Sequence, residues 1–272
     1  MKKVLVLLDI DGTILNEKYE ITSKNIYDII SKCKERGVIF GFNSNRAIED
    51  MIPLYKELGL NGFIIGENGA FVKFDKEEEI ITKMGEDINL LRELLPGYLT
   101  KEIKNSKYVL EDTVAFLKNP KIEENSPSIL MLSNKFRRYS FSIHMKKLVN
   151  GRLEKDLDLT NQGSKIISKL ITEKNLSLKV STSNTFGNIL INPSDCNKGS
   201  TLKKIIFEKF KDYTTIMIGD DLQDKMVMSV VDFFYAVGNA DEEVKRNADY
   251  IAQSNFTQGV EEILLNKVLI NN

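Results

Sequence analysis

The stretch that decides the fold is Val4-Leu5-Val6-Leu7-Leu8-Asp9-Ile10-Asp11-Gly12-Thr13. An aliphatic run with no polar alternation predicts a parallel strand that is buried on both faces. Asp9 and Asp11 then emerge at the carboxyl end of that strand, where open α/β sheets form their ligand sites. Two carboxylates one residue apart can hold a divalent cation through one group and leave the other for nucleophilic attack or proton transfer. The stretch therefore predicts a catalytic loop.

Strands and helices continue to alternate through the first and last thirds of the chain. Strands are predicted at 38–42, 63–65, 214–218, 233–237 and 250–252, and helices at 26–33, 48–58, 222–230, 241–247 and 258–267. Gly37 lies where a helix-ending glycine belongs, after a helix whose apolar face includes Cys33. This alternation predicts a mostly parallel sheet with right-handed crossovers.

The middle of the chain has a different pattern. Charge-rich helices are predicted at 88–95 and 165–174, and short alternating strands at 140–144, 178–181 and 188–191. We therefore predict an α/β protein with two domains. Residues 1–82 and 192–272 form a Rossmann-like, doubly wound, mostly parallel core, and residues 83–191 form an inserted α+β cap domain.

Composition excludes several classes of partner. With 38 basic and 39 acidic residues the net charge is -1, which gives no electrostatic reason to bind nucleic acid or an anionic membrane. No segment approaches the roughly 18 to 20 apolar residues of a membrane helix. The apolar run after Met1 stops at Asp9, and the chain has only two cysteines, so we expect a cytoplasmic protein that acts on a small molecule.

Further polar residues follow other predicted strands or precede a helix. Ser44 ends the second strand, Lys198 precedes a helix, and Asp220, Asp221 and Asp224 follow the strand at 214–218. Phosphoryl transfer requires a nucleophile such as a carboxylate, together with a hydroxyl, an ammonium and a site for a hard cation. Most of the catalysis comes from stabilising the charge on the phosphoryl oxygens. The whole set of residues indicates phosphoryl transfer more specifically than any one of them does.

This ordered set resembles the haloacid dehalogenase superfamily of phosphatases, in the Cof-like branch with a C2-type cap. The matching motifs are Asp9 to Thr13, Ser44, Lys198 and Gly219 to Asp224. Two further segments are similar to that branch, Asn68-Gly69-Ala70 and Gly238-Asn239-Ala240. The resemblance covers the predicted core, whereas the cap matches in position and size only.

The resemblance implies Mg²⁺-dependent hydrolysis of a small phosphomonoester, a sugar phosphate or a related metabolite, through an aspartyl-phosphate. It makes Asp9 the nucleophile, Asp11 the acid and base, and Ser44 and Lys198 the groups that hold the phosphoryl group. The phosphate site that it implies comprises Asp9, Gly12, Ser44, Asn45, Arg46 and Lys198. The Mg²⁺ ligands that it implies are Asp9, the Asp11 carbonyl, Asp220 and Asp224.

Two departures from the family pattern affect the substrate more than the chemistry. Gln223-Asp224 replaces the usual Asn-Asp, and Asn45 stands where glycine is common. We expect the larger Asn45 side chain to narrow the pocket near the phosphate. In the cap, His144 and Arg137 are candidate substrate contacts, although a packed histidine and a solvated arginine are the simpler interpretations.

Other functions stay open at this point. A phosphomutase would use the same nucleophile and return the phosphoryl group to a sugar. A phosphate-sensing module would bind without turnover, although it would not need Asp9 and Asp11 together. A glycosyltransferase would not need Lys198 or the second acidic cluster. The sequence does not distinguish a monomer from a homodimer.

Overall fold

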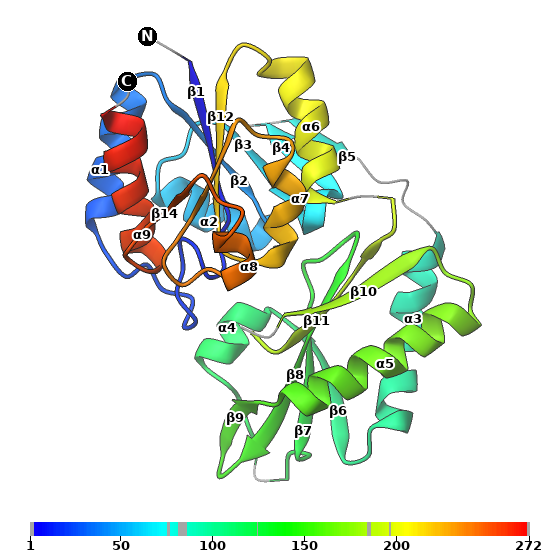
Figure 1. The fold of residues 1–272 in the computed structure, drawn as a ribbon. Coiled ribbons are helices and arrows are strands. Elements are labelled where there is room, and N and C mark those ends of the chain that lie inside the picture. The colour runs from blue at the N-terminus through cyan, green and yellow to red at the C-terminus, as the bar shows by residue number, and fades with distance from the viewer. Residues whose placement is uncertain are drawn as a thin grey trace. The chain divides into compact units, whose positions relative to one another are not determined.

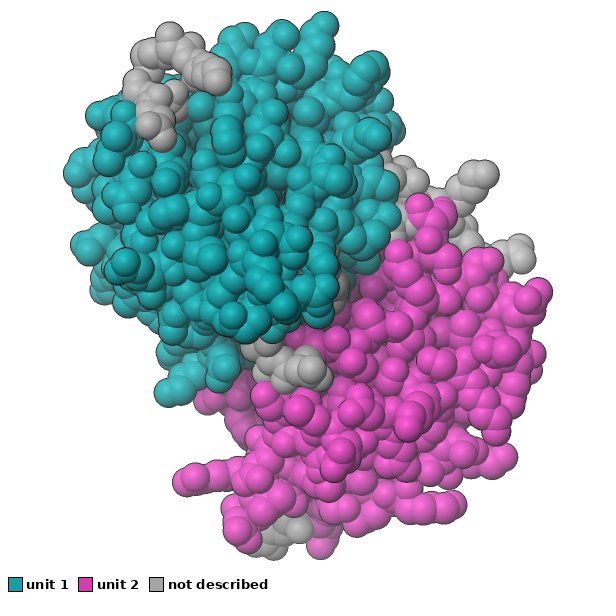
Figure 2. Space-filling view, in the orientation of Figure 1, with its two compact units in different colours: residues 1–81, 196–272 teal, residues 82–195 magenta. Residues whose placement is uncertain are grey.

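The computed structural model describes residues 3–74, 77–80, 86–123, 125–183, 186–195 and 197–270. The chain divides into two compact units, coloured separately in Figure 2. Unit 1 comprises Met1–Ile81 and Cys196–Asn272, and unit 2 comprises Thr82–Asp195. The boundary that the sequence predicts at 82–83 lies outside the described residues.

Unit 1 is built on an eight-stranded sheet in the order β14-β13-β12-β1-β2-β3-β4-β5 (Figure 1). The strands are β1 (Val4–Leu8), β2 (Ile39–Asn43), β3 (Phe63–Gly66), β4 (Phe71–Phe74), β5 (Glu77–Ile80), β12 (Thr214–Gly219), β13 (Phe233–Ala236) and β14 (Tyr250–Ile251). All neighbours from β14 to β3 pair in parallel, whereas β4 and β5 are antiparallel additions. The predicted mostly parallel core is thus confirmed.

The position of β1 determines where a ligand site can form. Its Leu8 pairs with Phe42 of β2 on one side and with Ile218 of β12 on the other. The chain therefore winds away from β1 in one direction in its first third and in the opposite direction in its last third. The carboxyl ends of β1 and β12 flank this switch point, which is where open α/β sheets bind ligands.

Helices cover both faces of this sheet. They are α1 (Asn25–Glu35), α2 (Ile48–Glu57), α6 (Lys198–Lys209), α7 (Lys225–Met228), α8 (Glu242–Lys245) and α9 (Phe256–Ile263), with 3-10 turns η1 (Glu67–Gly69) and η2 (Leu222–Asp224) and a π-helical segment η3 (Leu264–Leu269). In Figure 1, α1 and α9 lie on one side of the sheet, and α6 and α7 lie on the other. This is the doubly wound arrangement.

Helix α1 shows how the sequence pattern becomes structure. Its Ile26, Ile30 and Cys33 are completely buried, as the apolar spacing predicts. Gly37 follows with a φ of +79°, and its N–H donates to the carbonyl oxygen of Lys34 at 2.8 Å. The left-handed glycine ends the helix and turns the chain into β2.

Unit 2 is a mixed sheet with the helices α3 and α5 packed on one face. Its strands are β6 (Ser106–Glu111), β7 (Ile129–Asn134), β8 (Phe141–Val149), β9 (Arg152–Lys155), β10 (Leu178–Ser183) and β11 (Asn188–Pro193), in the order β10-β11-β8-β7-β6 with β9 beside β8. Its helices are α3 (Glu86–Glu102), α4 (Thr113–Lys118) and α5 (Leu157–Glu173). Apolar residues of α3 and α5 and one face of the sheet form a single buried cluster, which includes Leu91, Ile143 and Ile167.

Several predicted helices have different limits in the structure. Helix α3 continues through Pro96 to Glu102, because Leu95 and Leu99 extend its buried stripe beyond the proline. The predicted helix 222–230 is instead a 3-10 turn followed by the short α7. The predicted helix 258–267 begins earlier, at Phe256, and changes to π geometry after Ile263. None of the described helices has both the length and the apolar character needed to cross a membrane.

Candidate active site

The loop after β1 is held open by a glycine and tied to β12. The Asp9 N–H donates to the Ile218 carbonyl at 2.9 Å, which extends the parallel pairing one residue beyond β1. Gly12 then adopts a φ of +86°. The Thr13 hydroxyl donates to Asp220 Oδ1 at 2.8 Å. Residues from opposite ends of the chain are thereby brought to one edge of the sheet.

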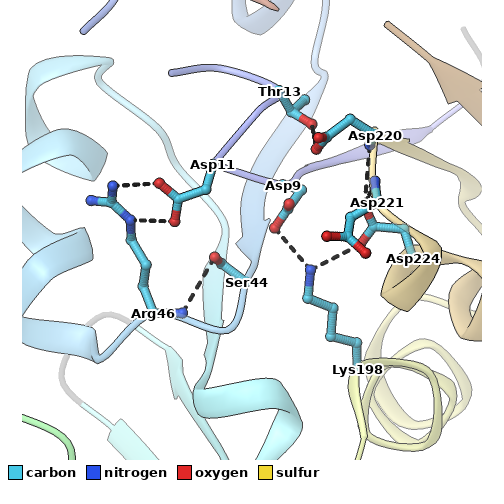
Figure 3. A network of polar contacts seen from close by, with 9 residues as sticks. All are labelled: Asp9, Asp11, Thr13, Ser44, Arg46, Lys198, Asp220, Asp221 and Asp224. Atoms are coloured by element: carbon cyan, nitrogen blue, oxygen red, sulfur yellow. Dashed lines mark hydrogen bonds and ion pairs between the residues drawn. The ribbon is translucent and has the colours of Figure 1, made fainter. Parts of the chain in front are cut away.

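Three buried carboxylates meet at this edge around one ammonium group (Figure 3). Asp9, Asp220 and Asp224 each offer an oxygen, and these oxygens lie within 4.8 Å of one another. Lys198 Nζ donates to Asp9 Oδ1 at 2.9 Å and to Asp224 Oδ1 at 2.8 Å. Asp224 Oδ2 accepts the backbone N–H groups of Asp220 at 3.2 Å and Asp221 at 3.3 Å. Hard oxygen ligands in such a cluster suit a divalent cation.

Lys198 reaches the carboxylates from the first turn of α6. Asn197 caps this helix, and its side chain and that of Ser200 form a reciprocal capping box. The Thr201 hydroxyl donates to the Gly69 carbonyl at 2.7 Å, which ties the start of α6 to the segment after β3. A cation is unfavourable at a helix N-terminus, so the carboxylates must stabilise it there.

Burial controls the charge state of the cluster. Desolvation raises the pKa of Asp9 to about 7, although the Lys198 ammonium opposes this shift. Burial and the neighbouring charges of Asp9 and Asp224 raise the pKa of Asp220 well above its usual range. Burial would lower the pKa of Lys198, but Asp224 and Asp9 outweigh it and raise that pKa. The ammonium therefore stays charged while two of the acids hold protons more tightly.

Asp11 faces a different partner. The Arg46 guanidinium donates to both of its carboxylate oxygens, at 2.7 Å from Nε and 2.6 Å from the terminal nitrogen. The Tyr19 ring lies 5.4 Å from the guanidinium carbon. Ser44 is 2% exposed, and its Oγ accepts the Arg46 N–H at 3.4 Å. Asp11, Ser44 and Arg46 thus form a second group beside the acidic one (Figure 3).

The structure brings most of the residues predicted for the site to one place. Asp221, whose role the sequence leaves open, has its carboxylate outside the acidic group of the described residues, and the Asp11 carboxylate pairs with Arg46. Asn45 is half-buried in the loop between Ser44 and Arg46. The side chain of Gln223 lies outside the described part of the chain.

Sequence reasoning missed two residues that support the loop. Thr13 and Asn239 lie within the motifs, but nothing in their local sequence assigns them a role. Thr13 orients Asp220, and Asn239 Nδ2 donates to the Gly12 carbonyl at 2.7 Å while its Oδ1 accepts the Phe256 N–H at 2.8 Å. Only the folded chain reveals these contacts, because the partners of Asn239 are far away in the sequence.

In unit 2, the sheet face opposite the buried cluster carries polar side chains. His144 is 6% exposed and pairs across strands with Leu132 and Asn188. Asn188 Nδ2 donates to the Ser142 hydroxyl at 3.1 Å. Arg137 lies in the preceding loop, buried, and donates to the Ser140 hydroxyl at 2.8 Å. Both side chains are therefore largely buried, with His144 in the sheet and Arg137 in the loop before β8.

Comparison with known proteins agrees with this geometry. Residues 6–264 match the family of haloacid dehalogenase-like hydrolases. A phosphoglycolate phosphatase of Staphylothermus marinus is 27% identical over 96% of this chain and 95% of its own. The 5-amino-6-(5-phospho-D-ribitylamino)uracil phosphatase of Bacillus subtilis is 25% identical over 97% and 96%. A haloacid dehalogenase-like hydrolase structure from Bacteroides thetaiotaomicron superimposes with a TM-score of 0.69 at 22% identity, over 97% and 99% of the two chains.

The match along nearly the whole chain defines the class of protein: a hydrolase whose core is a doubly wound, mostly parallel sheet. The chain belongs to the haloacid dehalogenase-like hydrolase family. The predicted family, fold class and enzyme class, a phosphoric monoester hydrolase, are confirmed.

Gly12 gives the first testable prediction. A Cβ at this position would lie 2.1 Å from Asp220 Oδ2. We expect Gly12→Ala to lower kcat/KM at least 100-fold and to destabilise the protein, because Asp220 must move and the φ of +86° strains any other residue. Steady-state kinetics and thermal unfolding measure the two effects.

Gly37→Ala is the matched control. Its φ of +79° imposes similar strain, but an added Cβ would have no atom within 4 Å. It should lower stability by about 1–2 kcal/mol and leave kcat/KM unchanged. Equal losses of activity in the two variants would contradict the assigned role of Gly12.

Proposed function

We propose that this protein hydrolyses a small phosphomonoester, a sugar phosphate or a related metabolite, with Mg²⁺ and through an aspartyl-phosphate. The observation that carries the proposal is the buried Asp9–Lys198–Asp224 contact at the switch point of the sheet. Binding alone does not require a nucleophilic carboxylate beside a buried ammonium. The phosphatase names of the relatives support the same chemistry.

The acidic group fits a magnesium ion. Asp9 Oδ1 accepts a hydrogen bond from Lys198, and Asp220 Oδ1 accepts one from Thr13. The described residues provide no hydrogen-bond donor to Oδ2 of either aspartate. These two oxygens would hold the ion with the Asp11 carbonyl. Both Asp224 oxygens already accept hydrogen bonds, so Asp224 would support the ion directly or through water. The bound ion would supply positive charge to the phosphoryl oxygens.

The protein groups around the phosphate would divide the remaining work. Asp9 would attack phosphorus, and Lys198 and Ser44 would hold phosphoryl oxygens in line for that attack. Arg46 pairs with Asp11 in the structure, and a guanidinium also binds phosphate in a bidentate manner. If the substrate phosphate replaced Asp11 as the partner of the Arg46 guanidinium, the Asp11 carboxylate would be free to protonate the leaving oxygen and then to activate water.

The direct test is phosphate release from a panel of phosphorylated metabolites and an aryl phosphate, with and without Mg²⁺. Activity should need Mg²⁺ and should fall at least 1,000-fold in Asp9→Asn, which keeps the shape of the side chain but removes the nucleophile. Isomerised sugar phosphate without phosphate release would favour a phosphomutase. Binding of phosphate without either reaction would favour a phosphate-sensing module.

The raised pKa of Asp9 predicts how Mg²⁺ binding depends on pH. In the folded, metal-free protein this carboxyl titrates near pH 7, against an ordinary value of 3.8. Its stabilising contribution is therefore complete below about pH 4 and is lost as the pH rises through about 7. Mg²⁺ must displace this proton, so its affinity should rise about tenfold per pH unit between pH 5 and 7.

Thermal unfolding at pH 5.5 and pH 8, with and without Mg²⁺, measures this effect without any substrate. The rise in Tm at a fixed subsaturating Mg²⁺ concentration should be larger at pH 8. Asn at position 9 cannot titrate, so Asp9→Asn should show a smaller difference between the two pH values than wild type, while Asp220, whose pKa is also raised, keeps part of it. An equal rise in wild type at both pH values would contradict the assignment of Asp9 to the ion.

We also propose that unit 2 selects the substrate, as the family resemblance implies for a cap. Its sheet face with Ser142, His144 and Asn188 offers hydroxyl, imidazole and amide groups, which suit a leaving group rich in hydroxyls. His144→Ala should lower kcat/KM for the best metabolite about 10-fold or more and leave kcat/KM for the aryl phosphate within twofold. Equal changes for both substrates would contradict a role in selection.

A further inference from the structure

Asn43 is a buried amide in the core of unit 1 for which the hydrolase chemistry above has no use. It is the last residue of β2, directly before Ser44, and it is completely buried. Within the described part of the chain neither its Oδ1 nor its Nδ2 has a hydrogen-bond partner. An unsatisfied buried polar group destabilises a fold, and an apolar side chain at the same position would avoid that loss of stability. The Asn43 amide therefore does not stabilise the fold, and we infer that it serves the function of the protein.

The sheet register puts Asn43 beside the nucleophile. Leu8 pairs with Phe42, so the residues that follow them, Asp9 and Asn43, are lateral neighbours. Neighbouring strands lie about 4.8 Å apart, which is within reach of two short side chains that point to one face. The Asp9 N–H to Ile218 and the Ser44 N–H to Ile65 bonds show that both strands stay in the sheet at this level.

The two side chains also share a face. A Cβ on Gly41 would lie 3.2 Å from Leu7 Cδ2, so Gly41 and Leu7 face the same side. Phe42 faces the other side, where its ring packs 6.0 Å from Tyr55 of α2. Because side chains alternate along a strand, Asn43 and Asp9 return to the face of Gly41 and Leu7. The amide and the nucleophilic carboxylate therefore lie next to each other.

The reaction creates a need for a hydrogen-bond donor at this point. In the structure Asp9 Oδ1 is held by Lys198, whose ammonium would have to turn towards the phosphoryl oxygens during phosphoryl transfer. Asp9 Oδ1 would then lose its hydrogen-bond donor, which would leave the carboxylate held through Oδ2 by the proposed ion. Water is a poor substitute, since Asp9 is 5% exposed and Asn43 is not exposed at all.

We propose that Asn43 is a positioning residue for the nucleophile, which deepens the function proposed above and rests on it. As Lys198 shifts to the phosphoryl group, the Asn43 Nδ2–H donates to the Asp9 carboxylate and holds it in line with phosphorus. The bond does not change the covalent chemistry: the Asp9 oxygen still forms the bond to phosphorus as the leaving oxygen departs. Asn43 acts only through Asp9 and does not touch the substrate.

The test compares Asn43→Ala and Asn43→Ser with Asn61→Ala. Asn61 is the matched control because its amide is fully used: it accepts the Phe40 N–H at 2.9 Å and donates to the Val38 carbonyl at 3.3 Å, both at the other end of the β2 region. Each variant is assayed for kcat, KM, the single-turnover burst of leaving group, thermal unfolding, and Mg²⁺-dependent binding of beryllofluoride, a mimic of a phosphoryl group on a carboxylate.

We expect opposite patterns in the two alanine variants. Asn43→Ala should lower kcat and the burst rate about 10- to 100-fold. Its KM should stay within twofold of wild type, and its Tm should be close to wild type. Asn43→Ser, which keeps a shorter hydrogen-bond donor, should restore part of the rate. Asn61→Ala should lower Tm and leave kcat unchanged. A Tm loss in Asn43→Ala with wild-type kcat would overturn the proposal, because it would show an amide that serves only the fold.

The design separates this proposal from the proposed function. A wild-type enzyme that hydrolyses phosphate esters while Asn43→Ala keeps its kcat overturns the role of Asn43 alone. If the true ester is missing from the panel, weaker beryllofluoride binding by Asn43→Ala than by wild type supports the role, and equal binding overturns it. A wild-type protein that neither hydrolyses an ester nor binds beryllofluoride overturns both proposals.

Discussion

The contact on which the rest of the site depends is the ammonium of Lys198 between Asp9 and Asp224, because three carboxylates are buried here beside one lysine. Removing the cation would leave uncompensated buried charge, which typically destabilises a protein by about 3–5 kcal/mol. Lys198 and Asp9 are 189 positions apart in the chain, so this contact forms only when the first and last thirds share one sheet. The acidic cluster with its lysine therefore forms only when the core of unit 1 folds.

A metal ion and protons would compete for the same oxygens in this cluster. Burial raises the pKa of both Asp9 and Asp220, so protons relieve part of the electrostatic strain at low pH and a divalent cation would relieve it at higher pH. Arg46 has the equivalent position beside Asp11, where it neutralises the second carboxylate of the loop. Each acid of the Asp9-to-Thr13 loop is thus held by its own cation, and the reaction that we propose would draw both cations towards the phosphate.

Much of the fold could be predicted because local patterns in the core are strong. Aliphatic runs identified β1, β2, β3 and β12, and Gly37 ended α1 as expected. The predictions failed where tertiary contacts overrule local signals. Pro96 does not end α3, since packing on the unit 2 core favours continuing the helix, and β6 was overlooked because its charged sequence forms a strand only by pairing with β7. The segment after Asp220 was expected to be helical, but Asp224 accepts backbone N–H groups there and a 3-10 turn forms.

The sequence by itself indicated the class of chemistry, because Asp9, Asp11, Ser44, Lys198 and the acidic cluster stand at strand ends and a helix start in an order that favours phosphoryl transfer. It also determined the parallel core, since runs such as 4–8 and 214–218 can be buried only in the middle of a sheet. Tertiary structure alone decided the pairings: Arg46 with Asp11, Thr13 with Asp220, and Asn43 beside Asp9. The physical reason is that strand order and register set these distances, and neither is written in the local sequence around any one of these residues.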